Sequence, residues 1–178
     1  MNWLFLILTL AWHSSDSPPP RVKTGADILI EQRLSLLRGK RVGLITNATG
    51  RIASGEMLLD ALIGRGIAVT ALFGPEHGIR GTSGAGEAVA DSTDRETGIP
   101  IYSLYGRVRK PTPAMLERVD ILVYDIQDVG ARFYTYLSTM GLCMESAAER
   151  GIPFLVLDRP NPLGGDMIDG PVLPDSLR

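Results

Sequence analysis

A glutamate and a histidine stand side by side in the stretch FGPEHGIRGTSGAG, where the apolar run AVTALFG ends. The apolar run is typical of a buried strand, and the stretch after the pair contains four glycines, Gly78, Gly81, Gly84 and Gly86. A partly shielded carboxyl at the end of a strand can have a raised pKa and act as a general acid. Glu76, with His77 beside it, is therefore a candidate proton donor of the kind that glycoside hydrolysis requires. An exposed turn with two polar residues is the alternative interpretation.

The other apolar runs of the chain also end in polar residues. Five runs are predicted strands: 41–47, 68–74, 99–106, 120–128 and 152–160. They lack a clean alternation of apolar and polar residues, which is typical of strands buried on both faces. Besides Glu76 and His77, the polar residues at their ends are Thr46, Asn47, Tyr105, Asp125, Asp128, Asp158 and Arg159. Because the carboxyl ends of parallel strands form the ligand crevice of such sheets, we expect these side chains to converge on one site.

Helical patterns alternate with these runs. We predict helices over 54–66, with Ser54 as its cap, over 111–120, with Thr112 as its cap, and over 132–151. The apolar face of the last helix is predicted to consist of Leu137, Met140, Met144 and Ala148. The segment from Pro75 to about Thr97 is predicted to be a lid or binding loop. This order of elements predicts an α/β fold, a doubly wound and mostly parallel sheet with helices on both faces.

Composition and charge limit the classes of function. The chain has 178 residues, 44% of them hydrophobic and 21% charged, which is ordinary for a globular domain with a substantial core. Its net charge of −2 gives no electrostatic case for a nucleic-acid partner. The single cysteine, Cys143, excludes an internal disulfide and is predicted to be a small buried hydrophobe.

The first residues differ from the rest of the chain. The run MNWLFLILTLAW is apolar but too short for a stable membrane span, and its length suits the apolar region of a secretory signal. The following SSDSPPP is typical of a linker. We therefore expect residues 1–20 to be a signal segment and linker, residues 21–178 to be the folded domain, and the protein to be exported to the periplasm or the extracellular space.

Several other chemistries fit the sequence poorly. The glycines after His77 lack the lysine and hydroxyl of a phosphate-binding loop, and no dinucleotide fingerprint follows any strand. The stretch GTSGA does not complete the nucleophile motif of a serine hydrolase, and one histidine after the leader is too few for a zinc hydrolase. A magnesium ion held by Asp125, Asp128 and Asp158 stays open, and with it a metal-dependent phosphoesterase.

Six longer motifs resemble one family in their sequence and their order. They are KTGADILI, GKRVGLITNATG, ALFGPEHGIRG, TGIPIYSLYG, DILVYDIQDVGARFYTYLSTM and FLVLDRPNPLGG. Together, from about Val22 to the end, they resemble the exo-β-N-acetylmuramidase family of peptidoglycan-recycling glycosidases. The resemblance implies a Rossmann-like N-terminal domain that faces a second domain across a cleft. It also implies removal of N-acetylmuramic acid from the non-reducing ends of peptidoglycan fragments, with muropeptides as partners and no cofactor.

The resemblance also assigns site residues. The PEHG motif implies that Glu76 is the catalytic acid, with His77 tuning or orienting it. The other motifs bring an orienting Asp125 and the substrate-binding residues Asn47, Gln127, Asp128, Arg132, Tyr134, Asp158, Arg159 and Asn161. The lactyl carboxylate of the substrate would be held by Arg80, Arg132 or Arg159. Whether the 2-acetamido group of the substrate or a protein carboxylate is the nucleophile stays open.

The resemblance ends soon after the LDRPNP motif. Members of the family continue into the second domain, which this sequence lacks, so we expect the chain to look truncated and its activity alone to be in doubt. A non-catalytic module that binds muropeptides is therefore an alternative to the enzyme.

Overall fold

The computed structural model describes residues 22–75, 79 and 92–177 of the chain. Within these ranges, six strands form one sheet in the order β3-β4-β2-β1-β5-β6. Five of them pair in parallel, and β3 is antiparallel to its neighbour β4. The strands are β1 (Arg41–Thr46), β2 (Ala68–Gly74), β3 (Ser92–Thr93), β4 (Pro100–Ser103), β5 (Ile121–Asp125) and β6 (Phe154–Val156).

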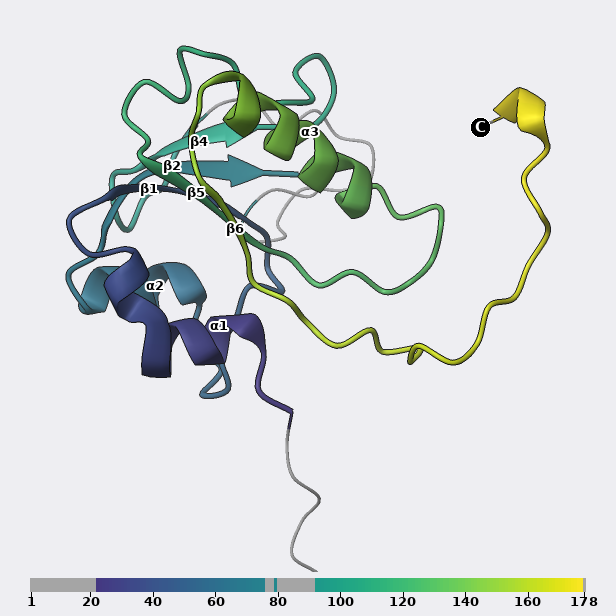
Figure 1. Cartoon of the computed structure of the whole chain (residues 1–178). Helices are drawn as coiled ribbons and strands as arrows, with labels where there is room; N and C mark the ends of the chain where they lie inside the picture. Colours follow the sequence, from purple (N-terminus) through teal and green to yellow (C-terminus); the bar gives the residue numbers. More distant parts are fainter. Residues whose placement is uncertain (1–21, 76–78, 80–91, 178) are drawn as a thin grey trace, which may run out of the picture.

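Helices cover both faces of this sheet (Figure 1). On one face lie α1 (Gly25–Ile28), which continues as a π-helix (Leu29–Arg33) and a 3-10 turn (Leu34–Leu36), and α2 (Leu58–Gly64). On the opposite face lies α3 (Tyr136–Glu149), and a short 3-10 helix (Asp175–Leu177) ends the described chain. The arrangement confirms the predicted doubly wound α/β fold.

The sheet separates two apolar cores. Alternate residues of the central strands enter each core, as the twofold period of a strand requires. Leu44 and Leu72 pack with α1 and α2, whereas Ile45 and Phe73 pack with α3. All five residues of β5 are buried, which explains why the central runs showed no polar alternation.

The N-terminal helical segment and β3 were not predicted. Thr24 and Asp27 form a capping box, in which the Thr24 hydroxyl accepts from the Asp27 N–H and the Asp27 carboxylate accepts from the Thr24 N–H. β3 falls within the segment that we expected to be loop throughout, and its two residues pair with β4. β3 is too short to show a pattern in the sequence. The N-terminal segment does carry apolar residues at helical spacing, Ala26, Leu29, Ile30, Leu34 and Leu37, a signal that we did not use.

Two of the predicted helices differ from the structure. The segment 111–120 forms successive turns instead of a helix, because most of its hydrogen bonds join residues three apart, such as Val119 N–H to Leu116 O. Its predicted cap is nevertheless present, since Thr112 Oγ1 accepts from Met115 N. The second difference concerns α2, which begins at Leu58, not near Ser54. A turn through Gly55, whose φ is +87°, occupies the preceding residues, and Arg51 pairs with Met57 across it.

The buried face of α3 is not the predicted one. The helix begins at Tyr136, and it buries Thr139, Cys143, Ser146 and Ala147. Leu137 is 64% exposed, Met144 is 46% exposed and Ala148 is also exposed, so three of the four predicted core residues face outward. Met140 is half-buried against the core. The buried apolar side chains of α3 belong to the core on this face of the sheet, and Tyr136 and Met140 pack against the same core. Cys143 is fully buried as predicted, and burial raises the pKa of its thiol to about 12.

No helix within the described ranges is both long enough and apolar enough to cross a membrane. The apolar run at the N-terminus lies outside these ranges.

Candidate functional site

A buried ion pair lies at the carboxyl edge of the sheet. Asp125, the last residue of β5, is 0% exposed, and the Arg159 side chain just after β6 is 8% exposed. Arg159 Nε donates to Asp125 Oδ1 at 2.7 Å, and Arg159 Nη2 donates to Asp125 Oδ2 at 3.0 Å. The planar guanidinium therefore binds the carboxylate in a bidentate manner, through two parallel hydrogen bonds, which is the strongest geometry for such a pair.

The same pair also fixes the loop that follows β1. Arg159 Nη2 donates to Arg51 O at 2.9 Å, and Thr46 Oγ1 donates to Asp125 O at 3.0 Å. Gly50 fits between them without a side chain, since a Cβ there would lie 2.1 Å from Thr46 Oγ1 and 3.1 Å from Asp125 Oδ2. This loop lies at the switch point, where the chain turns from β1 to one side of the sheet and later places β5 on the other side.

Asp27 of α1 supports this region from the N-terminal side. Its Oδ1 accepts from Ala53 N at 2.7 Å, which ties α1 to the loop after β1. Burial acts to raise the pKa of Asp27, but hydrogen bonds from Thr24 and Ala53 and the charge of Arg159 outweigh it, so the pKa lies below its usual value. Asp27 is thus an anion close enough to Arg159 to feel its charge. Its sequence signal is the Thr24-x-x-Asp27 spacing of a capping box, which we did not use.

Two opposing effects act on the pKa of Asp125, and the net result is a raised pKa. Burial raises the pKa of its carboxyl, and the hydrogen bonds and charge of Arg159 act in the opposite direction. The charge of Asp27 adds to the effect of burial. Since Arg159 occupies both carboxylate oxygens, the geometry suits Asp125 to holding neighbouring groups in position.

A chain of hydrogen bonds joins two of the predicted residues, Asn47 and Gln127, through Thr49. Asn47 is buried, and its Oδ1 accepts from Thr49 Oγ1 at 2.5 Å. The Thr49 hydroxyl oxygen accepts in turn from Gln127 N at 3.0 Å, and Gln127 Nε2 donates to Pro160 O at 2.9 Å. The loops after β1, β5 and β6 are therefore locked together. Thr49 was missed because a threonine in a loop has no distinctive sequence signal.

Asp128 and Asn161 shape the loops at the same edge. Asp128 Oδ1 accepts from Gly130 N at 2.8 Å, and Asn161 Oδ1 accepts from Leu163 N at 3.0 Å. Gly130 has a φ of +70°, and a Cβ there would lie 2.4 Å from Asn161 Nδ2. Asp158 is exposed, and its backbone oxygen accepts from Gly25 N at 2.7 Å.

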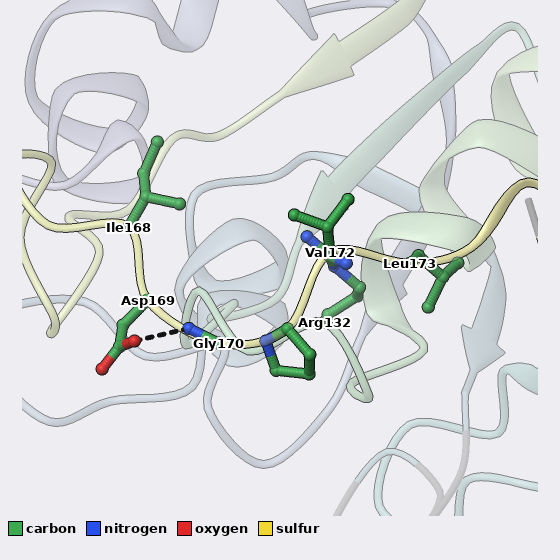
Figure 2. A pocket seen from close by; sticks show the side chains of 7 residues that line it. Arg132, Ile168, Asp169, Gly170, Val172 and Leu173 are labelled. Carbon is green, nitrogen blue, oxygen red and sulfur yellow. Dashed lines mark hydrogen bonds between the residues drawn. The ribbon is translucent and has the colours of Figure 1, made fainter.

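Arg132 and Tyr134 stand apart from this network. Arg132 lines a hollow of about 350 Å³ together with residues 168–173 of the C-terminal tail (Figure 2). Tyr134 is 41% exposed and contacts the rings of Phe133 and Tyr136. The structure thus brings together Asn47, Asp125, Gln127 and Arg159, with Asp128 and Asn161 beside them, but not Arg132 or Tyr134. The predicted Glu76, His77 and Arg80 lie outside the described residues.

Carboxylates do not gather into a metal-binding group in the described part of the chain. Across 22–75, 79 and 92–177, no three His, Cys, Asp or Glu side chains are arranged to hold a metal ion. Asp125, Asp128 and Asp158, which the sequence left open as magnesium ligands, therefore do not form such a group there.

The fold and this network define a doubly wound α/β domain whose polar residues meet at the switch point of the sheet. Residues 42–178 match the family described as "Exo-beta-N-acetylmuramidase NamZ, N-terminal", and the chain belongs to this family. The resemblance seen in the motifs is therefore confirmed.

Individual relatives agree with this assignment. The peptidoglycan beta-N-acetylmuramidase NamZ of Bacillus subtilis strain 168 is 53% identical over 176 residues, which cover 96% of this chain and 42% of the relative. The crystal structure of a DUF1343 family protein from Bacteroides fragilis has a TM-score of 0.78 and 51% identity, and a second from the same organism has 0.73 and 39%. Each match covers 88% of this chain and 40% of that structure, so the chain spans about two fifths of the length of these relatives.

Proposed function

We propose that this chain is part of an exo-acting glycosidase that removes N-acetylmuramic acid from the non-reducing ends of peptidoglycan fragments. The observation that carries the proposal is the 53% identity, over 96% of the chain, to a peptidoglycan beta-N-acetylmuramidase. The hydrogen-bonded network at the carboxyl edge supports it, because four of the residues that the motifs assigned to the site belong to that network.

In the proposed mechanism, Glu76 donates its proton to the oxygen of the leaving sugar as the bond from C1 to that oxygen breaks. A water molecule then supplies the hydroxyl that ends on C1, and its remaining proton returns to Glu76. Asp125 and Arg159 act as positioning residues that fix the loops after β1, β5 and β6. We further propose that the protein is exported, since peptidoglycan fragments with this sugar are formed outside the cytoplasmic membrane.

The Glu76→Gln variant tests the mechanism. Glutamine has nearly the shape of glutamate but cannot donate a proton to the leaving oxygen, so we expect ligand binding to persist and turnover to fall by about 10²- to 10⁴-fold. The loss should shrink on an aryl glycoside with an activated leaving group, because that group needs little protonation. Mass spectrometry of released N-acetylmuramic acid, with a muropeptide that carries this sugar at its non-reducing end, measures the effect.

Two arms separate the enzyme from a binding module. The first uses the 178-residue chain, and the second uses a chimera that continues it with the remaining part of the Bacillus relative. Release of the sugar in either arm supports the glycosidase. Retention of the muropeptide without release in both arms favours the binding module. Turnover of Glu76→Gln within about threefold of wild type would exclude Glu76 as the acid.

A further inference from the structure

A second hollow lies at the carboxyl end of β4, beside the first turns of α3. Its volume is about 580 Å³, which falls in the range of pockets that take small ligands. Its lining residues are Leu104, Tyr105, Gly106, Arg109, Thr135, Ser138, Thr139 and Leu142. None of them belongs to the Asp125–Arg159 network, and the motifs assigned none of them to the site.

The hollow combines one guanidinium with hydroxyl groups and an apolar wall. Arg109 supplies the positive charge, and it forms no ion pair within the described ranges. The adjacent Lys110 is already matched, because its Nζ binds Glu145 at 2.6 Å and Glu149 at 3.0 Å. Thr135 and Ser138 add hydroxyl groups, and Leu104 and Leu142 form apolar parts of the wall. Such a set suits a polar ligand that carries a carboxylate.

The backbone connects this hollow to the strand that leads to the proposed acid. Leu104 N donates to Gly74 O at 2.9 Å, at the end of β2. Pro75 and Glu76 follow Gly74 directly in the sequence. The hollow therefore lies beside the strand end from which the chain continues to Glu76, on the side of β2 away from β1.

The buried network reduces the number of arginines that are free to bind the lactyl carboxylate. Arg159 was one of three arginines that the sequence offered for the lactyl carboxylate, but its guanidinium is occupied by Asp125 and by Arg51 O. Arg132 faces the C-terminal tail (Figure 2), and Arg80 lies outside the described residues. Arg109 is the arginine that lines the larger hollow.

We propose that Arg109 binds the lactyl carboxylate of N-acetylmuramic acid in the hollow between β4 and α3. This inference rests on the proposed function for the identity of the sugar. It makes Arg109 a specificity-determining residue, which selects a sugar with a carboxylate over the same sugar without that charge.

Binding of two small probes tests the proposal independently of turnover. Calorimetry compares N-acetylmuramic acid with its lactyl methyl ester, which has the same shape but no charge. We expect the wild-type chain to prefer the acid by about 10- to 100-fold, the range for hydrogen bonds to a charged group. Arg109→Gln should lose this preference while keeping its affinity for the ester. Arg107→Gln, an exposed neighbour that does not line the hollow, should keep the preference.

The outcomes are distinct. A preference for the acid that survives in Arg109→Gln, or that disappears in Arg132→Gln instead, overturns the proposal, as does a wild-type chain with no preference. Equal thermal unfolding of Arg109→Gln and wild type confirms that the variant is folded, and Arg109→Lys, which keeps the charge, should restore part of the preference. If the sugar is released but the preference for the acid does not depend on Arg109, the proposed glycosidase stands and the proposed role of Arg109 is wrong. An Arg109-dependent preference without release of the sugar by either the 178-residue chain or the chimera supports the pocket but contradicts the glycosidase.

Discussion

Arg159 holds the loops at the carboxyl edge of the sheet through three contacts from one guanidinium. Two go to the carboxylate of Asp125 and one to the backbone oxygen of Arg51. A charge pair this buried gains from its own geometry roughly what it loses in hydration, so its presence alone does not imply a stable protein. The removal of one partner is different, because it leaves the other charge buried and unpaired.

We predict that Arg159→Met lowers the free energy of unfolding by about 3–5 kcal/mol. The unpaired Asp125 must then take up a proton in the folded state, so its folded pKa rises further above the unfolded value of about 4. Because the folded variant binds a proton that the unfolded chain releases above about pH 4, its stability falls as the pH rises. The loss of unfolding free energy relative to wild type should therefore be smallest near about pH 4 and grow with pH. Urea unfolding at several pH values measures both effects.

A matched control is the exposed pair of Arg41 and Asp120. Arg41→Met removes an equally good bidentate contact, but both partners keep their hydration, so we expect a much smaller change. Equal losses in the two variants, or a deficit in Arg159→Met that does not vary with pH, would contradict the role given to the buried pair.

At the scale of elements, the loop after β1 packs against the carboxyl ends of β1 and β5. Gly50 lies against Thr46 and Asp125, where a Cβ would overlap the Thr46 hydroxyl that donates to Asp125 O. The rotation of α3 is a comparable case, since the helix buries Cys143 and Ala147 while Leu137 and Met144 stay exposed. In both elements the contacts with distant segments decide the arrangement, and a hydrophobicity pattern does not report them.

We predict that Gly50→Ala destabilises the fold by about 1–3 kcal/mol, because the added methyl group would overlap Thr46 Oγ1. Gly141→Ala is the matched control. Gly141 lies inside α3 and a Cβ there meets nothing within 4 Å, so alanine should stabilise by about 0.5–1 kcal/mol through its better helix propensity. Thermal unfolding of both variants decides the matter, and a neutral Gly50→Ala would show that this loop can move aside.

At the scale of the whole molecule, the described chain is one sheet with two cores, followed by an extended tail (Figure 1). The tail exposes several large apolar side chains, Leu163, Met167, Ile168 and Val172. This chain matches 40–42% of the length of its relatives, so each relative is about two and a half times as long as the matched part. The chimera described above therefore tests whether activity needs more than these 178 residues.

Export of the protein is a second prediction that concerns the whole molecule. If MNWLFLILTLAW is a signal, cleavage should leave a mature N-terminus between Trp12 and Val22. Mass spectrometry of the protein purified from its natural host reads this terminus directly. An intact Met1 on a protein recovered from the cytoplasmic fraction would contradict export.

The sequence alone determined five of the six described strands, the fold class and the edge of the sheet at which polar residues gather. These properties follow from local composition and from the parallel arrangement that alternating strands and helices require. It also determined the family, because six motifs occur in one order. The burial of Cys143 followed from its residue type.

The tertiary structure decided which of the gathered residues touch. Asp125 and Arg159 are 34 positions apart, Gln127 and Thr49 are 78 apart, and Arg159 and Arg51 are 108 apart, so no local pattern could pair them. It also decided which face of α3 is buried, because that face is set by contacts with the rest of the core and not by the spacing of apolar residues along the helix. Local physics fixes what each segment can form, whereas contacts between distant segments fix which side chains become partners.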